Sequence, residues 1–177
     1  LMQHERVATD AASRQPHAAR RMPIDRGGRP SAAELQGAGN RSQGAADSAH
    51  ASREAQRTIA AIDFNREHVV IWVPATNSHT VPDAWSRGVR DAHPDGNVSS
   101  VLMDYPATSN FNESVATGTE TLRLVLAGIA AYDEAHGTHH TVTLGGHSQG
   151  AWVVGQAMSN PTIHRAVDGA AIFGRPG

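Results

Sequence analysis

The residues best suited to chemistry in this sequence form one glycine-flanked run, Gly146-His147-Ser148-Gln149-Gly150. An apolar run ends just before it, and an apolar run with helical character follows it. A serine between glycines at a strand-to-helix turn is typical of a nucleophile elbow, where the turn exposes the hydroxyl and the glycines let strand and helix pass closely. The alternative interpretation is an ordinary serine in a glycine-rich turn.

As a nucleophile, Ser148 would need help, because a serine hydroxyl alone reacts poorly. It requires a base, an acid that orients the base, and donors that stabilise the oxyanion. The backbone amide of Gln149 is expected to be one donor, since it follows the serine at the start of a helix. His147 adjoins the serine, but neighbours on a tight turn point apart, so it is expected to line the elbow rather than act as the base.

The rest of the chain alternates between strand and helix patterns. Strands are expected over residues 68–75, 98–105, 141–146 and 168–174. Helices are expected to be capped by Thr80, to begin near Asn112 and to follow Ser148. This alternation predicts an α/β fold with a parallel sheet flanked by helices. Ligands bind beyond the carboxyl ends of strands in such sheets, and Ser148 follows one of those ends.

Residues 1–57 differ in composition from the rest and are poor in large apolar side chains. Such a segment cannot bury enough surface to offset its chain entropy, so it is expected to be a polar linker or disordered extension. Residues 45–61 have high helix propensity and are expected to be helical near the end of this extension. The core domain is therefore predicted over residues 58–177.

Composition excludes several classes of function. The net charge of −2 gives no electrostatic footprint for nucleic acid, and the absence of cysteine excludes disulfides and thiolate catalysis. No apolar run approaches the roughly 18 residues that a membrane span needs. The nearby residues His136, His139 and His140 lack a matched carboxylate and a metal-site spacing, so neither a metal nor another cofactor is expected. Compartment and oligomeric state are left open.

The elbow and its surroundings resemble a known group. The run GGHSQGAWVV is similar to the nucleophile elbow of cutinases and cutinase-like α/β-hydrolases, in which Ser-Gln-Gly-Ala is typical. VVIWVPATNSHT resembles the first core strand and oxyanion loop of that group, and LMDYPATSNFNESVATGTETL resembles its Tyr-Pro-Ala segment. Actinobacterial hydrolases of the PE-PPE type carry similar blocks. The likeness covers residues 66–177.

The resemblance implies roles for individual residues. Ser148 would be the nucleophile, the Gln149 amide one oxyanion donor, and Thr76 or Asn77 the second. The enzyme would cleave a small-molecule or lipid ester without a cofactor, and would be secreted if it follows cutinases. The chain departs from the group in two ways: it lacks the disulfides that cutinases usually carry, and Ala75 stands where many relatives have a glycine after the proline.

The base and the acid are not found within the sequence. In this superfamily the order is serine, then Asp or Glu, then His. After Ser148 there are only His164 and Asp168, in reversed order, and Asp168 precedes an expected strand and so lies at the wrong end of the sheet. The acid and the histidine are predicted to lie beyond Gly177, which would leave this chain with little activity.

Two rivals to an esterase remain open. One is a catalytically inactive hydrolase fold that serves as a binding module. The other is a serine hydrolase that acts on amides or thioesters or transfers acyl groups, since these reactions share the tetrahedral intermediate. Asp104, at the end of the second expected strand, is interpreted as a pocket residue or a solvated loop carboxylate.

Overall fold

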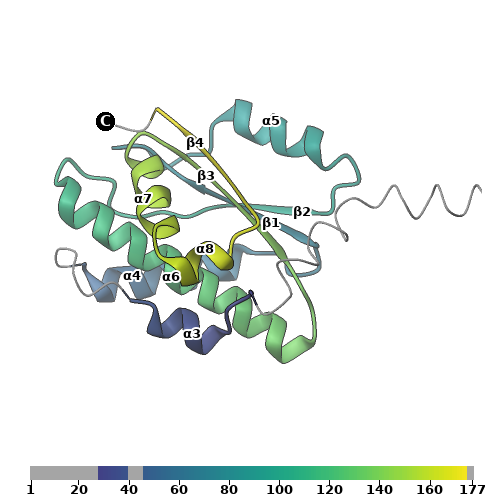
Figure 1. The fold of residues 1–177 in the computed structure, drawn as a ribbon. Coiled ribbons are helices and arrows are strands. Elements are labelled where there is room, and N and C mark those ends of the chain that lie inside the picture. The colour runs from purple at the N-terminus through teal and green to yellow at the C-terminus, as the bar shows by residue number, and fades with distance from the viewer. Residues whose placement is uncertain (1–27, 40–45, 175–177) are drawn as a thin grey trace, which may run out of the picture.

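The computed structural model describes residues 28–39 and 46–174, and within them four strands form one parallel sheet in the order β2-β1-β3-β4 (Figure 1). The strands are β1 (His68–Val73), β2 (Val98–Leu102), β3 (Thr141–His147) and β4 (Gly169–Phe173). Helices flank the sheet, so the predicted α/β fold is confirmed. β1 and β2 end earlier than the sequence pattern indicated, because the chain leaves the sheet at Pro74 and Met103 to form the loops of its carboxyl edge.

The helices are α3 (Ala32–Gly37), α4 (Ser48–Ala61), α5 (Asp83–Ala92), α6 (Phe111–His136), α7 (Gln149–Met158) and α8 (Pro161–Arg165). In the described part of the chain, α5 packs on one face of the sheet and the other helices lie on the opposite face (Figure 1). No helix there has the length and apolar character that crossing a bilayer demands.

The core lies between the sheet and α6 with α7. Successive residues of β1 point to opposite faces of the sheet. Val69, Ile71 and Val73 join the core under α6. Trp72 faces α5 and contacts Trp85, with ring centroids 4.9 Å apart. The expected apolar stripe of α6 is buried, and its members are Leu122, Leu126 and Ile129. The sheet is thereby closely packed on the side that carries α7.

The start of α5 differs from the prediction. Thr80 was expected to cap the helix, but Pro82 holds the N-cap position and the helix begins at Asp83. Proline disfavours helical backbone in the residue before it, so Val81 cannot be the first helical residue. The chain from Pro74 to Pro82 therefore stays an irregular loop at the carboxyl edge of the sheet.

The described residues before position 58 differ from the linker that composition predicts. Both α3 and α4 pack against α6, and α4 runs unbroken across the expected boundary at residue 57. Leu35 is 1% exposed, and the Arg123 guanidinium donates hydrogen bonds to the carbonyls of Leu35 and Gln36. These partners lie far along the chain, so composition could not indicate them. The remaining residues of the predicted extension, 1–27 and 40–45, lie outside the described residues.

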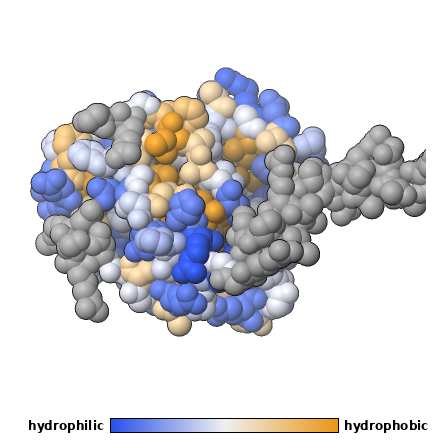
Figure 2. Space-filling model, viewed as in Figure 1, coloured by the Kyte–Doolittle hydropathy of each residue, from blue (hydrophilic) through white to orange (hydrophobic). Residues whose placement is uncertain are grey.

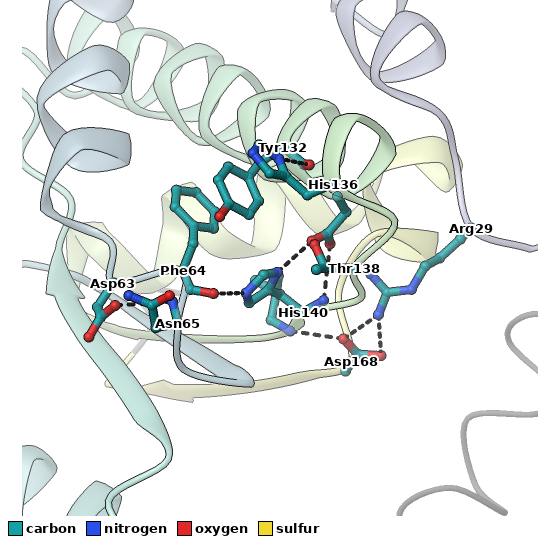
Figure 3. Close-up of polar contacts among 11 residues, drawn as sticks. Arg29, Asp63, Phe64, Asn65, Tyr132, His136, Thr138, His140 and Asp168 are labelled. Carbon is teal, nitrogen blue, oxygen red and sulfur yellow. Dashed lines mark hydrogen bonds and ion pairs between the residues drawn. The ribbon is translucent and has the colours of Figure 1, made fainter.

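A polar cluster lies at the edge of the sheet opposite Ser148 (Figure 3). The ring of His140 is 3% exposed; its Nδ1 lies 2.5 Å from Asp133 Oδ1 and its Nε2 lies 2.7 Å from the Phe64 carbonyl. Burial favours a raised pKa for Asp133, but hydrogen bonds from the His140 amide, the Thr138 hydroxyl and the His140 ring outweigh it and lower the pKa. Asp133 thereby joins the end of α6 to the start of β3.

Replacement of Asp133 by asparagine is expected to weaken the pH dependence of the free energy of unfolding between pH 3 and pH 7. The folded pKa of Asp133 is lowered, so its stabilising effect is present above the unfolded pKa of about 4 and is lost as pH falls through the folded pKa. Asp133→Asn should lower the free energy of unfolding by about 1–2 kcal/mol at pH 7 and by less at pH 3. Urea unfolding between pH 3 and pH 7 measures both effects.

The control is Asp91→Asn on the exposed surface of α5. It should leave the free energy of unfolding and its pH dependence unchanged. Equal pH dependence in Asp133→Asn and the wild type would show that the charge of Asp133 does not stabilise the fold.

Candidate active site

Ser148 joins β3 to α7 in a backbone conformation that residues other than glycine rarely adopt. Its φ is 53° and its ψ is −117°. Its amide donates to the Phe173 carbonyl at 2.9 Å, which fixes the turn against the end of β4. Ser148 stands at the N-cap of α7, yet its hydroxyl makes no capping hydrogen bond. Ser148 is half-buried, and its hydroxyl is not used to cap the helix.

The two glycines that flank Ser148 are required by the close passage of strand and helix. A Cβ placed on Gly146 would lie 2.7 Å from the backbone of Gly150. A Cβ placed on Gly150 would lie 2.0 Å from the Val73 carbonyl oxygen and 2.6 Å from that of Pro74. No side chain fits at either position unless the backbone moves. These contacts are the steric requirement that a nucleophile elbow imposes.

The Gln149 side chain is fully buried and connects three segments. Its Nε2 donates to Thr76 Oγ1 at 3.0 Å and to the Thr108 carbonyl at 2.8 Å, and its Oε1 accepts from the Ser114 hydroxyl at 2.5 Å. Its backbone amide is at the first position of α7, where no intrahelical acceptor exists. An amide at this position of a helix can donate to an anion placed at the helix N-terminus.

The loop after β1 brings Thr76 and Asn77 to the same edge. The Thr76 hydroxyl accepts from Gln149 and retains its own hydrogen for donation. Asn77 has φ 57°, and its backbone amide donates to the Ala107 carbonyl at 2.8 Å. Thr76 and Asn77 were both predicted as the second oxyanion donor. The Thr76 hydroxyl can still donate a hydrogen bond, whereas the Asn77 amide already donates to Ala107.

An apolar groove of about 790 Å³ begins beside the elbow. It runs between α5 and the face of the sheet, where Trp72 and Trp85 form part of its wall and His147 and Phe173 lie at the end near Ser148. His147 is exposed and lines this groove rather than the core. Figure 2 shows further hydrophobic surface near the C-terminal end of the described chain, where Ile172 and Phe173 of β4 are exposed.

His164 and Asp168 lie far from Ser148. The Asp168 carboxylate accepts from the Val142 amide at 2.9 Å and pairs with Arg29 (Figure 3). Val142 precedes Ser148 by six residues of β3, which is about 20 Å along a strand. His164 is exposed on α8, beyond the far end of α7. The structure therefore does not bring either residue to the serine.

Sequence reasoning missed a hydrogen-bonded pair at the carboxyl edge of the sheet. His79 Nδ1 lies 2.6 Å from Asp104 Oδ1, and the same oxygen accepts from the Tyr105 amide at 3.0 Å. Asp104 was considered as a pocket residue or a solvated carboxylate, but His79 was not singled out. Twenty-five residues separate the two, and no local pattern joins them. Their signal is positional, since each follows a strand whose carboxyl end lies near Ser148.

The histidines of the described residues do not form a cluster that could hold a metal ion. Across residues 28–39 and 46–174, no group of three or more histidine, aspartate or glutamate side chains converges. His136 and His140 engage the Tyr132 carbonyl and Asp133, respectively. These contacts are those of structural histidines.

Comparison with known proteins finds similarity to solved structures at low sequence identity. Neither the protein-family models nor the curated protein sequences contain a match. Two of the similar solved structures are of acetyl xylan esterase. An iodinated complex is 18% identical, with a TM-score of 0.45, and the match covers 63% of this chain and 64% of that one. A 0.90 Å structure is 19% identical, with a TM-score of 0.46 and coverage of 64% and 65%. The chain thus spans less than two thirds of either solved chain.

Proposed function

We propose that this chain carries the nucleophile of a serine hydrolase that cleaves carboxylic esters. The observation that supports this most strongly is the conformation of Ser148, held between two glycines that have no room for a side chain. Strained backbone of this kind persists where the surrounding structure enforces it, and it concentrates at functional sites. An ordinary turn would not need such strain at a serine.

The proposed reaction is acyl transfer through a covalent intermediate. The Ser148 oxygen attacks the ester carbonyl carbon while a histidine accepts the hydroxyl proton. The negative oxygen of the tetrahedral intermediate accepts hydrogen bonds from the Gln149 amide and from Thr76. Collapse of the intermediate breaks the bond to the alcohol, which takes the proton and leaves. Water, deprotonated by the same histidine, then releases the acid and restores Ser148.

The histidine and the acid of this reaction are expected to follow Gly177 in the full-length polypeptide, in keeping with the chain order of the cutinase-like hydrolases that the elbow resembles. The ester substrate is proposed from the resemblance of the Ser-Gln-Gly-Ala run to cutinase-like enzymes. The elbow itself would serve amides and thioesters equally, because these reactions share the tetrahedral intermediate. The groove beside His147 offers apolar surface next to the serine.

A second candidate is a hydrolase fold without catalysis. The observation in its favour is that His164 and Asp168, which follow Ser148, lie at the opposite edge of the sheet. A fold that lost its base would retain the elbow as a structural remnant and act as a binding module. The two candidates differ in one measurable property, the reactivity of the Ser148 hydroxyl.

The deciding experiment is fluorophosphonate labelling of the full-length polypeptide, with the modified peptide identified by mass spectrometry. A serine hydrolase should carry one label, on Ser148, within minutes at micromolar probe. The control is Ser159→Ala at the end of α7, which should label like the wild type. Absence of a label on Ser148 would favour the inactive module. Hydrolysis of matched p-nitrophenyl ester and p-nitroanilide substrates would then separate an esterase from an amidase.

A further inference from the structure

Backbone strain in this protein gathers at one edge of the sheet. In residues 28–39 and 46–174, three residues other than glycine have positive φ: Asn77, Ala107 and Ser148. Asn77 follows β1, Ala107 follows β2 and Ser148 follows β3, so all three lie at the carboxyl ends of neighbouring strands (Figure 1). A conformation of this kind is retained only where neighbouring contacts enforce it.

The first half of the loop after β1 is held by several such contacts. The Tyr105 hydroxyl donates to the Pro74 carbonyl at 2.7 Å, and the Asn77 amide donates to the Ala107 carbonyl at 2.8 Å. Burial, and then the charge of Asp104, raise the pKa of the Tyr105 phenol well above its usual range, so the hydroxyl remains a donor. Thr76 is bonded to the buried Gln149. Residues 74–77 are thus fixed to both neighbouring segments.

The second half of the loop returns to the sheet through His79. Its Nδ1 is bonded to Asp104 Oδ1, and Asp104 is itself oriented by the Tyr105 amide. Both side chains are exposed, 54% for His79 and 40% for Asp104. An exposed pair contributes little to global stability. Its effect is local, because it closes the loop that carries Thr76 onto the end of β2.

We propose that His79 and Asp104 form a positioning pair, which holds the loop so that Thr76 faces the oxyanion that forms at Ser148. The pair does not touch the reacting atoms and acts through the loop. This inference rests on the proposed function, since it assigns the loop to oxyanion stabilisation. A displaced oxyanion donor slows the chemical step while substrate binding is retained, because the donor acts mainly on the transition state.

The first test compares ester hydrolysis by His79→Ala and His79→Asn in the full-length polypeptide. Alanine removes the hydrogen bond to Asp104, whereas the asparagine amide can still donate it. We expect His79→Ala to lower kcat about tenfold, with KM changed less than twofold, and His79→Asn to recover kcat to within about threefold of the wild type. His164→Ala, an exposed histidine on α8, is the control and should match the wild type.

The second test measures how well the loop is held in place and does not require catalytic turnover. Hydrogen–deuterium exchange of the amides of residues 75–80 should be faster in His79→Ala than in the wild type, and His79→Asn should restore it. The melting temperature of His79→Ala should change by less than about 3 °C. This measurement separates a local loop effect from general unfolding.

The outcomes distinguish this inference from the proposed function. Unchanged kcat in His79→Ala, or equal losses in the alanine and asparagine variants, would overturn the positioning role. Unchanged exchange over residues 75–80 would overturn it independently of any activity. If hydrolysis in the wild type does not depend on Ser148, the proposed function fails, and with it the catalytic meaning of the pair. The exchange measurement would still show whether the pair holds the loop.

Discussion

Replacement of Ser148 by alanine is expected to abolish ester hydrolysis by the full-length polypeptide. Loss of a nucleophile in a serine hydrolase lowers kcat by about 10⁴–10⁶-fold, since the oxyanion donors alone give only a small residual rate. The fold should persist, because alanine fits wherever serine fits. The measurement is kcat and KM on a p-nitrophenyl ester, with circular dichroism to confirm folding. A variant that retains a tenth or more of the wild-type kcat would exclude Ser148 as the nucleophile.

The same position allows a matched test of strain. Ser148 has φ 53° and ψ −117°, and such a conformation costs a residue other than glycine about 1–3 kcal/mol. Glycine adopts it readily but loses more chain entropy on folding, about 0.5–1 kcal/mol. Ser148→Gly should therefore be about 1 kcal/mol more stable than the wild type by urea unfolding, and Ser148→Ala should not be. Equal stability of the two variants would argue against a strained elbow.

Replacement of Gly150 by alanine is expected to have the largest effect on stability. The new methyl group would lie 2.0 Å from the Val73 carbonyl oxygen, well inside van der Waals contact. That oxygen and the Pro74 carbonyl oxygen, 2.6 Å away, are backbone atoms of β1 and of the loop after it. Backbone atoms cannot rotate away as a side chain would. The free energy of unfolding should fall by about 3 kcal/mol or more, measured by urea unfolding.

Gly88→Ala in α5 is the matched control for this substitution. Gly88 also lies in a helix, but a Cβ at that position would meet no atom within 4 Å. Alanine is the better helix former, so Gly88→Ala should stabilise the protein by about 0.5–1 kcal/mol. A Gly150→Ala variant as stable as Gly88→Ala would contradict the close approach of α7 to β1.

The parts of this structure that sequence could predict depend on local patterns. Each of these patterns is formed by residues that are close together in the sequence. Examples are the apolar runs at β1 and β3, the stripe of Leu122 and Leu126 on α6, and the turn around Ser148. They suffice for the order of the strands along the chain and for the parallel sheet. The strand-to-helix turn at Ser148 was predicted in the same way, because its glycines and serine lie within five consecutive positions.

The parts that sequence could not predict depend on distant partners. Leu35 is buried because α3 packs against α6, where Arg123, 88 residues later, also binds the Leu35 carbonyl, whereas composition alone placed Leu35 in a linker. His79 meets Asp104 only because β2 lies beside β1 in the sheet. The hydrogen bond from the Asn77 amide to the Ala107 carbonyl could not be predicted from sequence either, because it forms only when the loops after β1 and β2 lie together.

The hydrogen bond from the Ser148 amide to the Phe173 carbonyl has a consequence for synthesis on the ribosome. The chain emerges from its N-terminus, so β1 and β2 can pair before β3 is made, but the elbow lacks its last support until β4 has emerged. The turn that carries Ser148 is thus completed late. A nascent chain arrested before Phe173 leaves the exit tunnel would contain every residue of the elbow, and its turn would still be open.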